Sequence, residues 1–238
     1  YYSVTSTHQY ADKTDAGRAM QALLDAYIGG ETREEQEATR RKREIERLTD
    51  RVRFADIPGF FPTPEPVIEQ MLALADIRPE HQVLEPSAGL GHIADAVRLL
   101  GVEPVCCEIR PALLEVLAAK GYKCVSGDFI ERFSVFDPVN GVGDAPDTLI
   151  YDRIIMNPPF EHQQDIDHVR HAFKVLRPGG RLVSVVSAGA FYRENRKAEE
   201  FRAWLTETGA ETIELPDDAF AKAFRRTGVK TYLVVINK

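Results

Sequence analysis

The stretch LEPSAGLGHIADAV, residues 84–97, decides the fold of this chain of 238 residues. A predicted strand leads into the stretch, a turn follows, and a helical pattern begins near His92. Gly89 and Gly91 in the turn lack Cβ atoms, so the backbone there can adopt a positive φ and approach a ligand closely. Because such a turn lies at the carboxyl edge of an open α/β sheet, where these folds bind their ligands, we predict a ligand-binding loop here.

Past Pro58, short β-rich runs alternate with helical ones, which is the pattern of a parallel sheet covered by helices on both faces. The last two predicted strands are too close in sequence for a crossover helix, so they should pair antiparallel. We therefore predict an α/β fold with a Rossmann-like, mostly parallel seven-stranded sheet and an antiparallel last strand. The predicted strands are residues 82–86, 104–109, 122–125, 152–157, 181–187, 211–215 and 230–236. The predicted helices between them are residues 65–76, 91–100, 111–120, 163–176 and 195–208.

The part of the chain before Pro58 has a different composition. Residues 14–28 carry apolar side chains at helical spacing, and two glycines then end the predicted helix. A second predicted helix, residues 31–53, is dense in charge and has a thin apolar stripe, which favours a mostly solvated helix. We therefore expect an N-terminal helical extension over residues 1–58 and an α/β domain over residues 59–238.

Composition and charge restrict the possible setting of the protein. The chain carries 30 Lys and Arg against 37 Asp and Glu, a formal charge of −7, so its overall charge does not attract a polyanion. Its 3 cysteines can form no disulfide framework, and His168 and His171 lack a clearly placed third metal ligand. The apolar runs are too short to span a membrane. We therefore expect a cytoplasmic protein without a metal site or a membrane segment.

Acidic residues beside the glycine turn bear on the identity of the ligand. Residues 89–94 match the dinucleotide fingerprint G-x-G-x-x-A, and Glu108 at the end of the next predicted strand could hold a ribose diol. These features fit a nicotinamide cofactor and S-adenosylmethionine equally. Glu85 favours S-adenosylmethionine, because its carboxylate suits a cationic ligand and would repel a pyrophosphate. Asp128 follows the third predicted strand, where it could accept a hydrogen bond from an adenine amine.

The tetrapeptide Asn157-Pro158-Pro159-Phe160 follows a strongly apolar predicted strand. Its two prolines fix φ and remove two backbone donors, so the Pro158 carbonyl and the Asn157 side chain are held as hydrogen-bond acceptors. Such a pair matches the two hydrogens of a planar exocyclic amine and would draw the nitrogen lone pair out of conjugation. Phe160 offers a face on which a flipped base can stack. The alternative is a stiff turn without chemistry.

With these motifs in this order, the chain resembles the class I S-adenosylmethionine-dependent methyltransferases, and specifically the NPPF-containing DNA adenine-N6 methyltransferases with gamma-type motif order. The resemblance rests on FFPTP (60–64), LEPSAGLG (84–91), CCEIRP (106–111), GDF (127–129) and NPPF (157–160). It implies a Rossmann-like methyltransferase fold with S-adenosyl-L-methionine as cofactor. It implies catalytic roles for Asn157, Pro158, Pro159 and Phe160. The implied cofactor contacts are Phe61, Thr63, Glu85, Pro86, Ser87, Gly89, Gly91, Glu108, Ile109, Asp128, Phe129 and Asn157.

Charge read locally favours contact with a nucleic acid. The last 20 residues contain 5 basic and no acidic residues, with Phe220 and Phe224 among them, which is typical of a surface that grips a strand and stacks on bases. A second basic rim follows Phe191. The competing interpretation is that the aromatic rings pack in the core and the charges are solvated. The predicted nucleic-acid contacts are Arg193, Arg196, Lys197, Lys222, Arg225 and Arg226.

The leading hypothesis is an enzyme that transfers a methyl group from S-adenosylmethionine to the N6 amine of adenine in DNA. The same chemistry could instead serve guanine or adenine amines in RNA, or a glutamine amide in a protein. A nicotinamide-dependent oxidoreductase would leave residues 157–160 without a role, and a non-catalytic partner subunit would use the helices of residues 14–53 to bind a second protein. Target recognition is expected from loops, from the N-terminal helices, from a partner subunit or from a recognition domain missing from this sequence.

Overall fold

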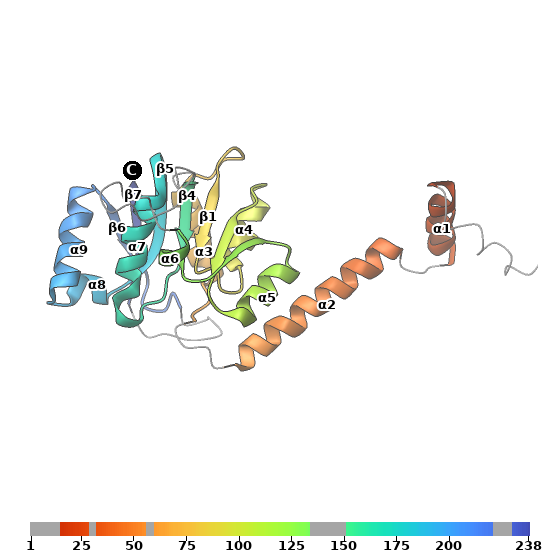
Figure 1. Ribbon diagram of the computed structural model, residues 1–238, viewed down its shortest axis with the longest axis horizontal. Coiled ribbons are helices and arrows are strands. Elements are labelled where there is room, and N and C mark those ends of the chain that lie inside the picture. The colour runs from red at the N-terminus through yellow and green to blue at the C-terminus, as the bar shows by residue number, and fades with distance from the viewer. Residues whose placement is uncertain (1–14, 29–31, 56–59, 134–150, 221–229) are drawn as a thin grey trace, which may run out of the picture. The chain divides into compact units, whose positions relative to one another are not determined.

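The computed structural model of the chain describes residues 15–28, 32–55, 60–133, 151–220 and 230–238 (Figure 1). By their internal contacts these residues form two units, Tyr1–Arg47 and Leu48–Lys238, and each is described by itself.

The first unit contains α1 (Asp15–Ile28) and most of α2 (Arg33–Phe54). The start of α2 is fixed by a capping box, in which the Thr32 hydroxyl accepts from the Glu35 N–H at 3.2 Å and the Glu35 carboxylate accepts from the Thr32 N–H at 2.7 Å. Reciprocal bonds of this kind satisfy backbone donors that the first turn of a helix would otherwise leave unpaired. Helix α2 therefore begins two residues after the predicted start.

The second unit is built on a seven-stranded sheet with the order β3-β2-β1-β4-β5-β7-β6. Among the described strands, β7 runs opposite to the other six and pairs antiparallel with β5 and β6, as predicted. The order reverses between β1 and β4, so the carboxyl ends of these two strands form the topological switch point where open α/β sheets bind ligands. The strands are β1 (Val83–Pro86), β2 (Val105–Glu108), β3 (Lys123–Ser126), β4 (Tyr151–Met156), β5 (Leu176–Ser187), β6 (Glu211–Glu214) and β7 (Thr231–Asn237).

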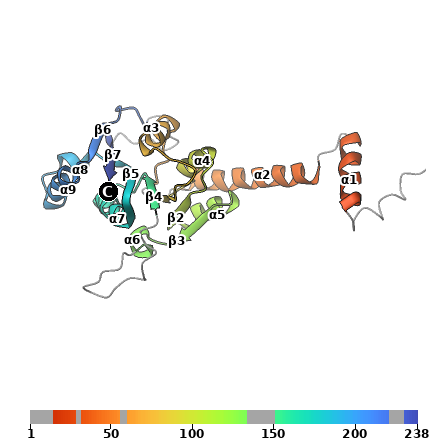
Figure 2. The same ribbon diagram turned by 90° about the horizontal axis from the view of Figure 1, so that it is seen from above.

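Helices cover both faces of the sheet, as Figure 2 shows from above. Alternate residues of β4 point to opposite faces: Ile154 and Met156 belong to one buried cluster, and Ile155 belongs to another. The first cluster includes residues of α7 and α9, and the second includes residues of α3 and α4. The helices are α3 (Glu65–Ala75), α4 (His92–Leu99), α5 (Pro111–Ala119), α6 (Phe129–Arg132), α7 (Gln164–Val175), α8 (Gly189–Tyr192) and α9 (Arg196–Glu207), with a short 3-10 turn, η2 (Glu161–Gln163).

The seven predicted strands and the five predicted helices of the α/β part are all present, so the predicted fold class is confirmed. Strand β5 begins at Leu176, five residues before the predicted start at Arg181, because Leu176 already pairs with Tyr151 and Gly179 donates to the carbonyl of Lys238 at 2.7 Å. Pro178, Gly179 and Gly180 favour a turn between the predicted helix and the predicted strand. Pairing with residues distant in sequence overrides that local preference. The four-residue helices α6 and α8 were not predicted.

The end of α2 belongs to the second unit. Leu48 and Val52 are 6% and 1% exposed and pack against Leu90, Leu113 and Val116. The thin apolar stripe predicted for this helix is therefore buried at Leu48 and Val52 and half-buried at Ile45. The predicted domain boundary between residues 58 and 59 stays a prediction, since residues 56–59 lie outside the described part of the chain.

Candidate active site

A cavity of about 400 Å³ lies at the carboxyl ends of β1, β2 and β4. This volume falls in the range of small-molecule sites. The lining residues come from five stretches of sequence that the fold brings together, within residues 60–63, 85–93, 107–113, 127–129 and 157–164, together with His168 of α7. All four residues predicted to be catalytic line the cavity, and so do the predicted cofactor residues other than Pro86 and Gly91.

Two glycines with positive φ shape the loop that follows β1. Gly89 has a φ of +58°, and a Cβ there would stand 2.8 Å from the ring of Phe60. Gly91 has a φ of +75°, and a Cβ there would stand 2.8 Å from Leu117. Gly89 therefore allows the wall formed by Phe60 to close over the loop, whereas Gly91 serves the packing of the loop on α5. Ser87 also has a positive φ of 58°, which costs a residue with a side chain about 1–2 kcal/mol.

The carboxylate of Glu108 is fixed at the end of β2 by three backbone donors. Oε2 accepts from the N–H of Gly89 at 2.8 Å, and Oε1 accepts from the N–H groups of Ile109 and Arg110 at 2.8 and 2.9 Å. A carboxylate offers about four acceptor positions, so roughly one remains for a ligand hydroxyl. Glu108 thus ties the glycine loop to β2 and still presents an acceptor at the cavity.

Glu85 is a buried carboxyl group in the wall of the cavity. Its side chain is 3% exposed and lines the cavity, and its Oε2 has no hydrogen-bond partner among the described residues. Burial raises the pKa of Glu85 well above its ordinary value, against the opposing effect of a hydrogen bond from the Ala94 N–H. A buried carboxylate without a partner destabilises the fold, and a cation beside it would remove that cost. The site therefore fits a positively charged ligand and disfavours a pyrophosphate.

Asp128 and Phe129 close another side of the cavity. Asp128 is the N-cap of α6, and its Oδ1 accepts from the N–H groups of Ile130 and Glu131 at 2.8 and 3.2 Å. Because one oxygen makes both cap bonds, Oδ2 is left to accept from a ligand donor. Phe129 is 3% exposed, and its ring contacts two histidine rings of α7. The centroid of the Phe129 ring lies 5.6 Å from that of His168 and 5.0 Å from that of His171.

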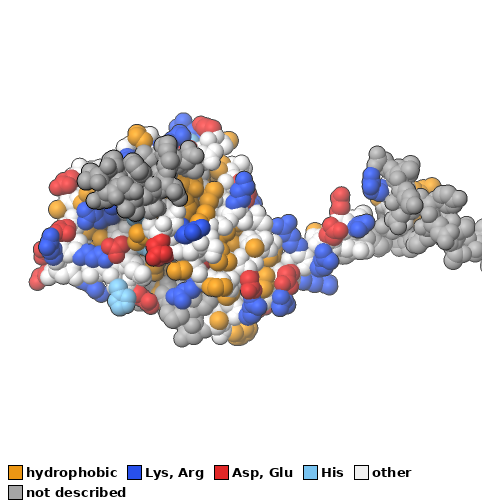
Figure 3. Space-filling model, in the orientation of Figure 1, with side chains coloured by type: hydrophobic (Ala, Val, Ile, Leu, Met, Phe, Trp, Pro, Cys, Tyr) orange, Lys and Arg blue, Asp and Glu red, His pale blue; other side chains and the backbone are white. Residues whose placement is uncertain are grey.

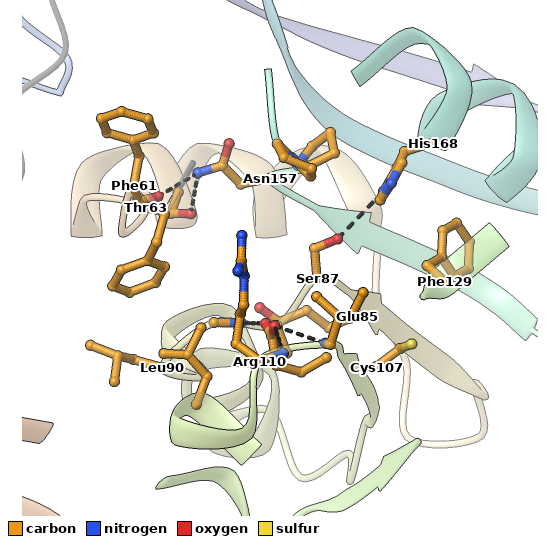
Figure 4. A pocket seen from close by; sticks show the side chains of 18 of the residues that line it. Phe61, Thr63, Glu85, Ser87, Leu90, Cys107, Arg110, Phe129, Asn157 and His168 are labelled. Carbon is orange, nitrogen blue, oxygen red and sulfur yellow. Dashed lines mark hydrogen bonds between the residues drawn. The ribbon is translucent and has the colours of Figure 1, made fainter. Parts of the chain in front are cut away.

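His168, Arg110 and Cys107 are among the lining residues of the cavity that were not predicted. His168 lies with Nδ1 3.4 Å from the Ser87 hydroxyl, and burial lowers its pKa to about 4, so the ring is neutral at physiological pH. Arg110 extends across the cavity toward Asn157 (Figure 4). Burial raises the pKa of the Cys107 thiol to about 12. Helical spacing of His168 with the apolar residues Ala172 and Val175, four and seven positions later, was the signal in the sequence for its burial.

The Asn157 amide is held by the FFPTP segment. Its Nδ2 donates to the carbonyl of Phe61 at 3.0 Å and to the hydroxyl of Thr63 at 3.1 Å (Figure 4). Both amide hydrogens are used in these bonds, so Oδ1 is the atom left for a substrate. Phe160 is half-buried and packs against the cluster shared with α3 and α4.

The predicted nucleic-acid contacts are only partly described. Arg196 forms an ion pair with Glu200 at 2.6 Å, and Lys197 forms one with Asp167 at 2.5 Å, so neighbouring acids offset both charges. Lys222, Arg225 and Arg226 lie outside the described residues, and Arg193 is exposed. Phe220 is 2% exposed in the core, which agrees with the competing interpretation that the aromatic rings of this segment pack inside. On the visible face of Leu48–Lys238, acidic and basic side chains are interspersed (Figure 3).

No group of three or more His, Cys, Asp and Glu side chains among the described residues is placed to hold a metal ion. The described helices include none with the length and apolar character needed to cross a membrane.

Residues 40–233 match the family profile described as a methyltransferase domain. Over 115 residues the chain is 25% identical to the "Probable ribosomal RNA small subunit methyltransferase A" of Methanosarcina mazei, covering 45% of this chain and 37% of that protein.

Solved structures share the fold. The type I restriction-modification methyltransferase subunit from Streptococcus thermophilus superimposes with a TM-score of 0.57 at 18% identity, over 75% of this chain and 45% of that one. A dimethyladenosine transferase from Plasmodium falciparum gives a TM-score of 0.50 at 14% identity, over 75% and 63%. The chain thus spans less than half the length of the archaeal and streptococcal proteins. The family match covers most of the sequence: the chain belongs to the methyltransferase-domain family, with the class I fold, and S-adenosylmethionine is its cofactor.

Proposed function

We propose that this chain transfers a methyl group from S-adenosylmethionine to the exocyclic N6 amine of adenine in DNA. The observation that carries the proposal is the Asn157 amide, whose two hydrogens are taken by Phe61 and Thr63 so that an acceptor oxygen remains. An acceptor fixed beside a cavity that suits a cationic cofactor is the arrangement needed to orient an amine for methylation.

The residues around the cavity fit the cofactor. The unpartnered Oε2 of Glu85 favours the cationic methionine end, the remaining acceptor of Glu108 suits a ribose hydroxyl, and Oδ2 of Asp128 suits an adenine amine. Ile109, which is 54% exposed, adds an apolar surface at the rim of the cavity. When bound, S-adenosylmethionine supplies an electrophilic methyl group on a sulfonium.

The chain's own residues prepare the amine. Oδ1 of Asn157 and the carbonyl of Pro158 accept its two hydrogens, which draws the nitrogen lone pair out of conjugation with the ring. The prolines at 158 and 159 keep the backbone carbonyl from moving. The exposed part of Phe160 provides a face for the ring of a base taken out of its stack. This preparation requires no covalent bond between the chain and the substrate.

Target recognition is proposed to come from outside the described cavity. The streptococcal protein that shares the fold is described as a subunit and is more than twice as long as the part that matches this chain. We therefore propose that a partner subunit, a further domain or the N-terminal helices select the DNA site. The basic residues at 193, 196, 197, 222, 225 and 226 stay proposed contacts to the nucleic acid.

A labelled-methyl transfer assay tests the proposal. The chain is incubated with S-adenosylmethionine carrying a tritiated methyl group and with separate pools of unmethylated DNA, RNA and protein. We expect label in DNA, at N6-methyladenine after digestion to nucleosides. Label confined to RNA would move the acceptor to RNA, in line with the name of the archaeal relative. Label in protein alone, or in none of the pools, would contradict the proposal.

Asp128→Asn separates cofactor contact from helix capping. Asn keeps an oxygen that can cap α6, but it places an NH2 group where Oδ2 would accept from the cofactor. We expect S-adenosylmethionine to bind about 10-fold more weakly, as for one lost hydrogen bond to a charged group, with the thermal midpoint nearly unchanged. Calorimetric titration and thermal melts measure the two quantities. Asp128→Ala removes the cap as well, so it should lower both; unchanged affinity in both variants would exclude Asp128 from the cofactor site.

A further inference from the structure

The two hydrogens of the Asn157 amide meet two acceptors from a segment more than 90 positions earlier in the sequence. The carbonyl of Phe61 lies 3.0 Å from Nδ2, and the hydroxyl oxygen of Thr63 lies 3.1 Å from it. A backbone carbonyl can only accept, so the amide atom that faces Phe61 must be the nitrogen. Oδ1 consequently points away from Phe61 and Thr63, as the close view shows (Figure 4).

The segment that carries these acceptors is itself held in place. Pro62 and Pro64 flank Thr63 and restrict the backbone on both sides of it. The Pro64 carbonyl accepts from the N–H groups of Val67 and Ile68 at 3.0 Å each, which begins α3. Val67 and Ile68 are 3% and 6% exposed in the core. Thr63 therefore lies just before the first turn of a helix that is anchored in the core, and Thr63 itself is 8% exposed.

An amide side chain without such partners has two orientations of similar shape. One presents an oxygen to the substrate and the other presents an NH2 group, and only the oxygen can accept a hydrogen from an amine. Turning the Asn157 amide by 180° would place Oδ1 against the Phe61 carbonyl, where two acceptors face each other. The hydrogen bonds of the amide to Phe61 and Thr63 thus select the orientation that the reaction needs.

We propose that Thr63 and the Phe61 carbonyl position the Asn157 amide, so that Oδ1 faces the acceptor amine. The proposal rests on the proposed function, and it makes Thr63 a positioning residue that acts through Asn157. This differs from the cofactor contact that the sequence pattern implies for Thr63. It also predicts that Asp cannot replace Asn at position 157 in this chain, because a carboxylate has no N–H to offer the Phe61 carbonyl.

Thr63→Val tests the proposal, because Val keeps the shape of Thr and removes its acceptor oxygen. At saturating cofactor and unmethylated DNA, we expect kcat to fall about 10-fold, the size of one lost hydrogen bond, with the cofactor Kd nearly unchanged. Thr63→Ser, which restores the hydroxyl, should recover most of the rate. A 15N NMR spectrum provides a readout that needs no methyl-accepting substrate. The side-chain amide signals of Asn157, identified by their loss in Asn157→Ala, should shift in Thr63→Val and return to their wild-type positions in Thr63→Ser.

Two outcomes would overturn the proposal. In the first, Thr63→Val weakens cofactor binding but leaves kcat at saturation and the Asn157 signals unchanged, which would make Thr63 a cofactor contact. In the second, Asn157→Asp retains kcat within about threefold of the wild type, although loss of a positioned group at a reacting centre should cost on the order of 100-fold. The second test also holds if Thr63→Val fails to fold. Failure to label DNA contradicts the proposed function instead and leaves the NMR result to decide the positioning.

Discussion

Asn157→Ala should lower kcat for methyl transfer to DNA by about 100-fold or more, because it removes an acceptor fixed at the reacting centre. The Asn157 side chain reaches the cavity from the end of β4 and is held from behind by the segment of Phe61 and Thr63. The rate is measured in single turnovers with cofactor in excess, and calorimetry should show a much smaller change in cofactor affinity.

Asn195→Ala is the matched control for this substitution. Asn195 is the N-cap of α9, where its Oδ1 accepts from the N–H of Ala198 at 3.0 Å, and it does not line the cavity. Loss of this cap should cost about 1 kcal/mol of stability and leave kcat within about twofold. Similar rates for Asn157→Ala and Asn195→Ala would contradict both the assigned role of Asn157 and the proposed reaction.

Glu85→Gln should change stability and cofactor affinity in opposite directions. Gln has the shape of the protonated carboxyl group and cannot ionise. The ligand-free variant therefore avoids the cost, present in the wild type above the unfolded pKa, of either holding a proton on Glu85 or burying its charge without a partner. At pH 8 we expect its thermal midpoint to rise by roughly 3–6 °C, which corresponds to about 1–2 kcal/mol for a chain of this size. Binding of S-adenosylmethionine should weaken by about 100-fold, because the charge that faces the cationic ligand is gone.

The pH dependence of this effect follows from the raised pKa of Glu85. The folded state keeps a proton on this carboxyl at pH values where the unfolded chain has released it. Stability of the ligand-free wild type therefore falls as pH rises from about 4.5, the unfolded value, through the folded pKa of Glu85. The difference in midpoint between wild type and Glu85→Gln should vanish near pH 4 and grow toward pH 8.

Two further measurements make the Glu85 prediction decisive. Binding of S-adenosylmethionine to the wild type should release a proton from Glu85, and binding to Glu85→Gln should release none. Calorimetry in buffers of different ionisation enthalpy detects this proton release. Glu69→Gln, the same change at an exposed position of α3, should leave both the midpoint and the affinity unchanged. Equal cofactor affinity in wild type and Glu85→Gln would remove Glu85 from the cofactor site.

The strands and long helices could be predicted because local patterns specify them. The buried strand Tyr151–Met156 is apolar along most of its length and ends at Asn-Pro-Pro, so composition and breakers mark both ends. Helix α6 could not be predicted in this way, because four residues are too few to show a period. The early start of β5 at Leu176 depends on pairing with Tyr151, which no local preference of Pro and Gly residues reveals.

The residues of the cavity likewise include some that the sequence predicts and some that only the folded structure reveals. Glu85 and Glu108 lie at the carboxyl ends of β1 and β2, and Asp128 follows β3. Parallel strands bring such residues to one edge of the sheet, so their meeting could be predicted. The bonds from Asn157 to Phe61 and Thr63 join positions 96 and 94 residues apart, and only the packed structure shows them. His168 was not predicted to line the cavity, because the sequence alone does not show which face of helix α7 meets the cavity.

The contact between Phe60 and the glycine loop has a consequence for cooperativity. Phe60 packs with Leu90 and Leu113, and the next three residues line the cavity and carry the acceptors for Asn157. Detaching this segment would remove a wall of the cofactor cavity and release the catalytic amide in the same event. Local unfolding of proteins proceeds in contiguous units of this kind, and a ligand that binds only the closed form stabilises the whole unit. Under the proposed function, occupation of the cofactor site and readiness of the amide are therefore thermodynamically linked, so that an empty molecule with an open segment is also a catalytically unprepared one.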